Sequence, residues 1–275
     1  MDLKHLSRLA ENLKPHETMP VLFIGHGSPM NGIEENDFSQ KWIELGKTIP
    51  QPTAVVCISA HWLTKGSFVT AEQYPKTIHD FGGFPQQLYE VQYPAPGNPV
   101  LAKEITTMAK YTAVGEDHEW GFDHGAWTVL RRMYPAANIP IIQLSIDYFK
   151  PGEYHHSLAK DLSELRKKGV LFVGSGNMVH NLRMVDFEKL DAPGYGYDWA
   201  IESNQIFKQK IFDGDDRSLM RYDQLGKSIS LAVPTPDHYW PLIYTLGLRK
   251  QNEAVEIFND QVMGGSITMA SVKFG

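Results

Sequence analysis

Short runs of apolar residues alternate along this chain with longer stretches in which apolar residues recur at helical spacing. The short runs are nearly continuous in β-branched and other apolar residues, which is typical of parallel strands that are buried on both faces. We predict strands over residues 21–24, 54–59, 139–146, 170–176, 228–233 and 266–274.

Amphipathic segments separate these strands. In residues 37–49, for example, Phe38 and Trp42 fall on one face of a helix. Strands that alternate with helices indicate an α/β fold, in which helices flank a central, mostly parallel sheet. We expect a single catalytic domain over residues 1–275, with residues 1–18 as an N-terminal extension or helix. The predicted helices are 37–49, 98–110, 124–134, 155–169 and 198–212.

One long stretch, residues 62–97, fits neither pattern. It is rich in aromatic residues, glycine and proline, as in FGGFP and YPAPG. Such composition favours ordered loops, and we expect them to cover one end of the sheet, with a short hairpin as one alternative.

Composition and charge narrow the class of protein. The 275 residues are 42% hydrophobic, which is enough for a sizeable core, and the formal net charge is −6. An acidic chain without basic runs is a poor candidate for binding nucleic acid or an anionic membrane. No apolar stretch is long enough to span a bilayer, and the N-terminus shows no secretory signal. The single cysteine, Cys57, excludes an intrachain disulfide. We therefore expect a cytoplasmic enzyme; neither its protein partners nor its oligomeric state follows from these features.

Four of the eleven histidines come shortly after predicted strands. In an α/β sheet, ligands bind in the crevice beyond the carboxyl ends of the strands. Imidazoles that are far apart in the sequence can therefore converge at this edge. The four residues are His26, His61, His180 and His238.

A site built mainly from histidines suits zinc, iron, nickel or copper, and a coordination position left open is the catalytic arrangement. A single histidine after a strand is more often structural, and this alternative applies to each of the four residues alone. Four such placements are harder to explain in that way, since Gly25 and Gly27 flank His26 and Gly174 and Gly176 precede His180.

The remaining histidines have other expected roles. His124 begins a predicted helix, where it would be an acid/base group, a substrate contact or a cap of the helix N-terminus. His79 lies in the aromatic loops and could line a pocket. The other motifs that we sought fail, since GxGxxG is incomplete and there is no P-loop, HExxH or GxSxG. Histidines in polar terminal or helical contexts, expected to be solvated, are His5, His16, His155 and His156.

Several short segments in this order make the chain resemble a known family. They are FIGHGSPM, ISAHW, TIHDFGGFP, YPAPG, DHGAW, GSGNMVHNL and PTPDHYWPL. The chain resembles the DODA-type extradiol aromatic ring-opening dioxygenases of the LigB superfamily, and is close to bacterial 4,5-DOPA-extradiol-dioxygenase-like proteins. The resemblance runs from about residue 20 to the C-terminus. It implies an α/β fold with a largely parallel sheet and one mononuclear divalent metal ion.

The resemblance also implies roles for individual histidines. By motif position, His26, His61 and His238 would be metal ligands. His180 would be a fourth ligand or the catalytic base, and either His124 or protonated His180 would be the acid. The best-known pattern of the superfamily has two histidines and a glutamate on ferrous iron, so His238 is a departure. Asp237 is expected to point away from the site, because we take its segment to be extended.

The implied reaction is extradiol cleavage of a catechol such as 4,5-DOPA by O2, with Fe(II) for activity and Zn(II) also compatible with the histidines. Two rival hypotheses remain from the residues alone: a zinc-dependent hydrolase with the same histidines, and a non-catalytic metal-binding protein. Arg183 could meet a substrate carboxylate, although a solvated arginine is the default. Aromatic residues that could wall a ring pocket are Trp62, Phe81, Phe84 and Tyr239.

Overall fold

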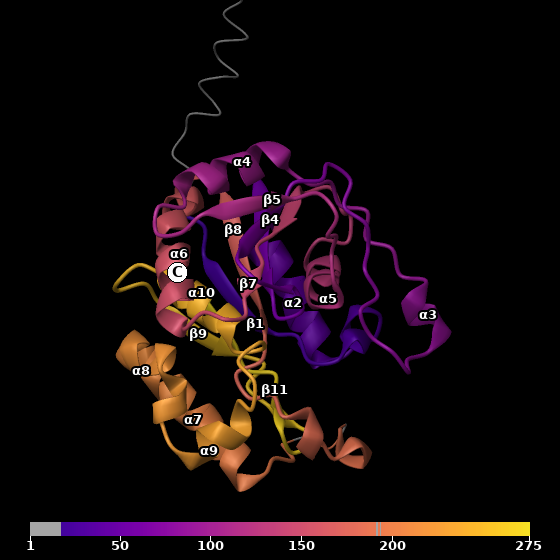
Figure 1. The fold of residues 1–275 in the computed structure, drawn as a ribbon. Coiled ribbons are helices and arrows are strands. Elements are labelled where there is room, and N and C mark those ends of the chain that lie inside the picture. Colours follow the sequence, from indigo (N-terminus) through magenta and orange to yellow (C-terminus); the bar gives the residue numbers. More distant parts are fainter. Residues whose placement is uncertain (1–17, 191, 193) are drawn as a thin grey trace, which may run out of the picture.

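The computed structural model describes residues 18–190, 192 and 194–275. A sheet runs through the middle of the molecule (Figure 1). It has six strands, in the order β6-β2-β8-β1-β12-β9. The first four of these strands are parallel to one another, and β12 and β9 add an antiparallel edge. The predicted α/β fold with a mostly parallel sheet is therefore confirmed. The strands are β6 (Ile141–Gln143), β2 (Ala54–Ser59), β8 (Val170–Gly176), β1 (Val21–Gly25), β12 (Ser271–Phe274) and β9 (Val255–Phe258).

Helices cover both faces of the sheet, which explains why the strands are apolar along their whole length. Successive residues of a strand point to opposite faces. Leu22 and Ile24 accordingly share a core with Trp42 of α2 and Trp127 of α5. Alternate strand residues form a second core with the opposite helix layer. The helices of the two layers are α2 (Asp37–Thr48) and α5 (His124–Met133) on one face and α6 (Gly152–Leu162) and α10 (Trp240–Leu248) on the other.

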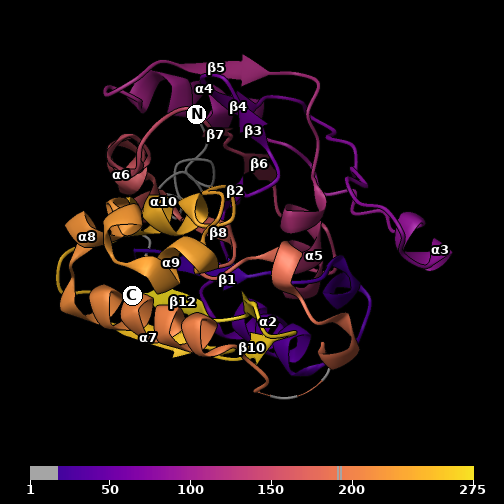
Figure 2. The same ribbon diagram turned by 60° about the horizontal axis from the view of Figure 1, so that its bottom comes forward.

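One predicted strand is wrong. Residues 228–232 lie in a helix, α9 (Lys227–Ala232), which Val233 follows, and its buried residues Ile229 and Ala232 are three positions apart. The short run of alternating serine and apolar residues resembled a strand, but this spacing matches one side of a helix. The apolar side packs against α7 (Asp198–Asp213), and Figure 2 shows α7, α8 (Asp216–Met220) and α9 grouped together.

Other expected elements are divided or extended. Residues 62–97 contain no paired hairpin; instead β3 (Leu63–Thr64) pairs with β7 (Ile146–Asp147), and β4 (Ser67–Thr70) pairs with β5 (Val114–Asp117). The loop that carries α3 (Gln86–Tyr89) projects from the body of the fold (Figure 1). The last predicted strand is split, and its first part, β11, pairs with β10. The remaining elements are α4 (Pro99–Met108), β10 (Val262–Met263) and β11 (Ile267–Thr268).

Two expectations about the chain's surface also have outcomes. His155 is fully buried rather than solvated, because its ring lies between α6 and α10 and is hydrogen-bonded to Tyr244. The expected N-terminal extension, with His5 and His16, lies outside the described residues except for Thr18. Within residues 18–190, 192 and 194–275, no helix has the length and apolar character needed to cross a membrane.

Candidate active site

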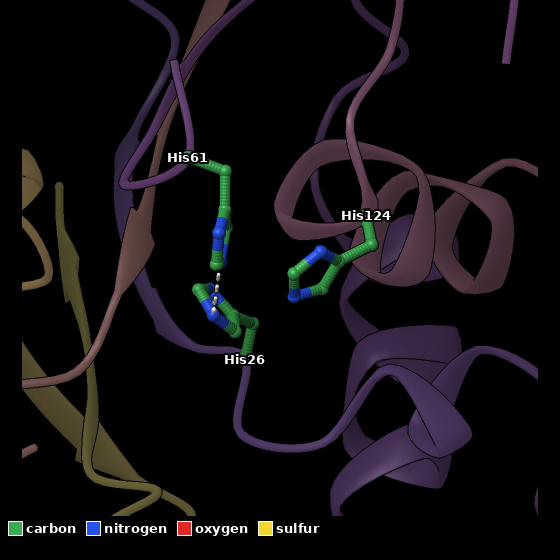
Figure 3. A group of neighbouring side chains, drawn as sticks. All are labelled: His26, His61 and His124. Atoms are coloured by element: carbon green, nitrogen blue, oxygen red, sulfur yellow. Dashed lines mark hydrogen bonds between the residues drawn. The ribbon is translucent and has the colours of Figure 1, made fainter. Parts of the chain in front are cut away.

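Three histidines meet at the carboxyl end of the parallel strands (Figure 3). His26 directly follows β1, His61 comes two residues after β2, and His124 is the first residue of α5. The Nε2 atoms of His26 and His61 are 3.2 Å apart, and the ring centroids of His61 and His124 are separated by 3.8 Å. One ring nitrogen from each residue lies within 4.8 Å of the other two. The sheet edge therefore brings together imidazoles from three distant segments.

His238 and His180 adjoin this group. The His238 ring centroid lies 5.3 Å from that of His26 and 4.9 Å from that of His61. The His180 ring stacks on His238 at 3.6 Å with an interplanar angle of 9°. All four histidines that were expected to follow strands, together with His124, thus form one cluster. His238, however, follows α9 and a turn, because the strand predicted before it is a helix.

Glycine at position 176 allows the segment of His238 to approach the sheet. A Cβ atom on Gly176 would lie 2.2 Å from the His238 carbonyl oxygen, a distance that no real side chain tolerates. The Asn177 backbone N–H donates to the same oxygen at 2.9 Å. Glycine is therefore needed at this position because the backbone of His238 packs directly against it.

The tautomer of His26 is fixed by a neighbouring serine. The Ser175 hydroxyl donates its one proton to the Gly125 carbonyl at 2.6 Å, so it can only accept at the 2.9 Å contact with His26 Nδ1. His26 therefore carries its proton on Nδ1. Its Nε2 lone pair faces His61, as in histidines that bind a metal through Nε2.

Carboxylates lie against the Nδ1 atoms of three further histidines. Asp80 Oδ2 is 3.0 Å from His124 Nδ1 and 3.5 Å from His61 Nδ1, and Asp237 is hydrogen-bonded to His238 Nδ1. The expectation that Asp237 points away is wrong, because its segment is a turn before α10 and not an extended strand. Sequence reasoning assigned no role to Asp80, although it lies in the quoted segment TIHDFGGFP.

Burial keeps these imidazoles neutral. It lowers the pKa of His26 and of His238 far below the usual range, and neighbouring imidazoles lower both further. Burial, followed by the charge of His124, lowers the pKa of His61 to about 3, and burial lowers that of His180 to about 4. Burial alone would raise the pKa of Asp80, but the nearby His124 and His61 rings and the backbone N–H of His124 produce a net lowering. The cluster thus combines neutral nitrogen donors with an anionic carboxylate.

These donors fit a divalent transition-metal ion. The Nε2 atoms of His26 and His61 face each other at 3.2 Å without room for two protons, so at most one ring donates a hydrogen bond to the other; a cation that displaced this proton would meet both lone pairs. Two nitrogen ligands at about 2.1 Å from a tetrahedral ion lie about 3.4 Å apart, which is close to the observed separation. Imidazole is also the ligand that iron and zinc share.

Some of the expected pocket residues border the cluster and others do not. Phe81 packs edge-on against His124 with ring centroids 5.6 Å apart, and Phe84 packs against Phe81. His79 joins the same aromatic group, and its Nε2 contacts the Val91 carbonyl. Tyr239, by contrast, is buried in the core of the α6–α10 layer. The other two expected residues are Trp62, which is buried and stacked on Trp120, and Arg183, which is exposed.

The fold and the cluster define an α/β protein with a group of histidines at the edge of its sheet that could hold a metal ion. Residues 13–215 match the family described as the catalytic LigB subunit of aromatic ring-opening dioxygenase. A protein of Escherichia coli K12 named 4,5-DOPA dioxygenase extradiol is 46% identical over 94% of this chain and 95% of its own length. A Beta vulgaris protein of the same name is 33% identical over 92% of this chain and 96% of its own length.

The fold is also found in a solved structure. The crystal structure of an uncharacterized protein from Escherichia coli K12 superposes with a TM-score of 0.79 at 39% identity, and the match covers 94% of this chain and all of that one. This chain belongs to the LigB family of aromatic ring-opening dioxygenases. It is therefore an enzyme of the oxidoreductase class, and a non-haem metal is the cofactor of this family. These similarities do not favour the rival hypothesis of a zinc-dependent hydrolase.

Proposed function

We propose that this enzyme opens the ring of a catechol such as 4,5-DOPA by extradiol cleavage and incorporates both atoms of O2. The names of the E. coli and Beta vulgaris relatives support this substrate, because the similarity covers nearly the whole of each chain. The observation that carries the proposal is the cluster of neutral imidazoles, with the Nε2 atoms of His26 and His61 facing each other at 3.2 Å. The cytoplasmic location and the lack of nucleic-acid and membrane partners remain predictions from composition.

The proposed metal ligands are His26, His61 and His238, with His180 at the ion in the resting enzyme or acting as the base. We propose ferrous iron, because a bound ferrous ion supplies electron exchange between a catechol and O2, whereas zinc has no accessible redox change. The contacts at Ser175 and Asp237 support the first and third assignments, since each holds Nδ1 of a ligand and leaves Nε2 free.

Two histidines would move protons during the reaction. His180 is neutral and stacks on His238, so it can accept the proton of a catechol hydroxyl bound beside it. His124 lies against both the Asp80 carboxylate and the Phe81 ring; we propose that its Nε2 takes up the second proton released by the catechol, with Asp80 stabilising the resulting imidazolium, and then donates this proton to the leaving oxygen. Phe81 and Phe84 would offer an apolar surface to the aromatic ring of the substrate.

Anaerobic loading of the protein with Fe(II), followed by oxygen-electrode and absorbance assays over a panel of catechols that includes DOPA, tests this function. We expect oxygen consumption in equal amount to substrate and a yellow ring-opened product. The zinc-loaded protein is the control and should consume no oxygen. Failure of every catechol with iron-loaded protein would overturn the proposal.

Single variants separate ligands from acid/base residues. His180→Ala should abolish turnover while keeping substantial iron if His180 is the base, whereas complete loss of iron would make it chiefly a ligand. His238→Ala should lose the ion. The His124 variant is the most informative, because a ring nitrogen of His124 lies close to those of His26 and His61. His124→Ala should retain iron and lose turnover; loss of iron would show that His124 replaces His238 as the third ligand.

A further inference from the structure

One carboxylate, that of Asp80, faces two histidines that come from different parts of the fold. Asp80 Oδ2 lies 3.5 Å from Nδ1 of His61, in the turn after β2, and 3.0 Å from Nδ1 of His124, on α5. Its second oxygen, Oδ1, accepts the backbone N–H of His124 at 2.8 Å. Three nitrogen atoms therefore converge on two carboxylate oxygens.

Capping of α5 does not account for this arrangement. The cap residue of α5 is Asp123, whose side chain accepts the Ala126 N–H at 3.1 Å and is itself held by Ser59 and Gln143. Asp80 approaches the helix from a separate loop. Its contacts with the two rings are therefore not needed to cap the N-terminus of α5.

Backbone contacts hold the loop of Asp80 against α5. The Ile78 N–H donates to the Phe122 carbonyl at 2.7 Å, and the Phe122 N–H donates to the Lys76 carbonyl at 2.8 Å. The Trp127 indole N–H donates to the Ile78 carbonyl at 2.9 Å. The Asp80 side chain is only one-fifth exposed, so its charge acts on the two imidazoles with little screening by water.

We propose that Asp80 is a positioning residue that sets the tautomer of His61 and His124 together. The His124 contact is not an aligned hydrogen bond, so the effect on that ring is chiefly electrostatic. A proton on Nδ1 of either ring lies close to the carboxylate, whereas a proton on Nε2 lies on the far side of the ring. Both rings therefore keep Nδ1–H and present an Nε2 lone pair to the centre. The assignment of His61 as ligand and His124 as acid rests on the proposed function; the tautomers do not.

An asparagine at position 80 could not make the same set of contacts as the Asp80 carboxylate. An amide has one accepting oxygen and one donating NH2 group. If the oxygen stays near the His124 backbone N–H, the NH2 group faces both Nδ1 atoms and drives their protons to Nε2, where they obstruct metal binding. If the amide is reversed, two N–H groups face each other at the start of α5. Either arrangement disturbs a ligand and an acid/base group at once.

The test is Asp80→Asn in the full-length, zinc-loaded protein, with 15N-histidine NMR to assign the tautomers and competition with a chromophoric chelator to measure zinc affinity. We expect His124 to change from Nδ1–H to Nε2–H and zinc affinity to fall by about 10- to 100-fold. Asp80→Glu, which keeps both accepting oxygens, should restore part of the affinity. The matched control is Asp161→Asn, because Asp161 likewise accepts backbone N–H groups, from Lys110 and Tyr111, but makes no hydrogen bond or ion pair with a histidine among the described residues.

The possible outcomes separate this inference from the proposed function. Unchanged tautomers and unchanged zinc affinity in Asp80→Asn would overturn the role of Asp80, even if the iron-loaded wild type opens catechols. Equal losses in Asp80→Asn and Asp161→Asn would also overturn it, since a general effect of removing a carboxylate would then suffice. Altered tautomers with weakened zinc binding would support it, even if no catechol were turned over.

Discussion

At the scale of single residues, the site depends on the groups behind the imidazoles. A histidine can direct only one lone pair at a metal, and the partner of its other nitrogen decides which one. Here Ser175 holds Nδ1 of His26, and Asp237 holds Nδ1 of His238. These contacts are buried or nearly so, so the rings are oriented before a ligand arrives.

Ser175→Ala should weaken metal binding by roughly tenfold, because His26 loses the acceptor that keeps its proton on Nδ1. The Gly125 carbonyl loses its donor in the same variant, and we expect a loss of about 1 kcal/mol in the free energy of unfolding. Chelator competition and urea unfolding measure the two effects. Wild-type metal affinity in this variant would show that the hydroxyl does not orient His26.

Gly125→Ala should displace His61 from the cluster. A Cβ atom at this position would lie 2.4 Å from Ser59 Oγ and 2.8 Å from His61 Cδ2. Alanine normally favours a helix over glycine by about 1 kcal/mol, so a loss of about 1–3 kcal/mol in unfolding free energy would show that the clash outweighs propensity. Metal content should fall in parallel. Gly82→Ala is the control, since a Cβ atom there meets nothing within 4 Å; a stabilised Gly125→Ala with full metal content would contradict the prediction.

At the scale of elements, the packing of α6 on α10 encloses a histidine that serves no part of the site. The ring centroids of His155 and Trp240 lie 5.0 Å apart. Nδ1 of His155 contacts the Tyr244 hydroxyl, and Nε2 contacts the Lys150 carbonyl. Burial lowers the pKa of His155 to about 4. The His155 imidazole is therefore neutral in the folded protein and takes up a proton more readily in the unfolded chain.

The stability of the α6–α10 layer should consequently depend on pH. Below about pH 6.5 the unfolded chain protonates His155 whereas the folded protein does not, so the free energy of unfolding falls as the pH drops from about 6.5 to about 4. The share due to His155 is on the order of 3 kcal/mol. His155→Gln should reduce the difference in unfolding free energy between pH 7.5 and pH 5.0, as measured with urea. A wild-type difference in His155→Gln would refute the assignment.

At the scale of the whole molecule, one arginine joins the start of the described chain to its last third. Arg166 is fully buried, and its guanidinium donates to the Met19 carbonyl at 2.7 Å and to the Leu248 carbonyl at 2.9 Å. The same group forms a two-pronged ion pair with Glu253, with distances of 2.7 and 2.9 Å. This network ties β1 and α10 to the segment that leads into β9.

Glu253→Gln should destabilise the fold by about 3 kcal/mol, because it leaves the buried Arg166 charge without its counter-ion. Guanidinium-induced unfolding gives the value. Glu256→Gln is the matched control: it removes an exposed pair with Lys273 and should cost less than about 1 kcal/mol. Similar losses in the two variants would mean that the buried pair contributes no more than a surface pair.

Local sequence patterns predicted the elements correctly where a segment is buried on both faces. The strands of β1, β2 and β8 are apolar on both faces, so their sequence alone indicated a covered parallel sheet. The same reasoning failed at α9, since the apolar residues of SISLAV alternate as in a strand, whereas the residues that are buried, Ile229 and Ala232, lie three apart on one side of a helix. It also failed at Asp237, because the direction of a side chain depends on the backbone conformation of its segment, and this segment is a turn.

The sequence by itself determined the fold class and the set of histidines, because hydrophobic periodicity and the order of strands and turns are properties of neighbouring residues. Only the tertiary structure showed which groups stand behind those histidines. Asp80 and Ser175 reach the cluster from segments far from the rings that they contact. Contacts of this kind depend on how packed layers place side chains in space, and no spacing along the chain encodes them.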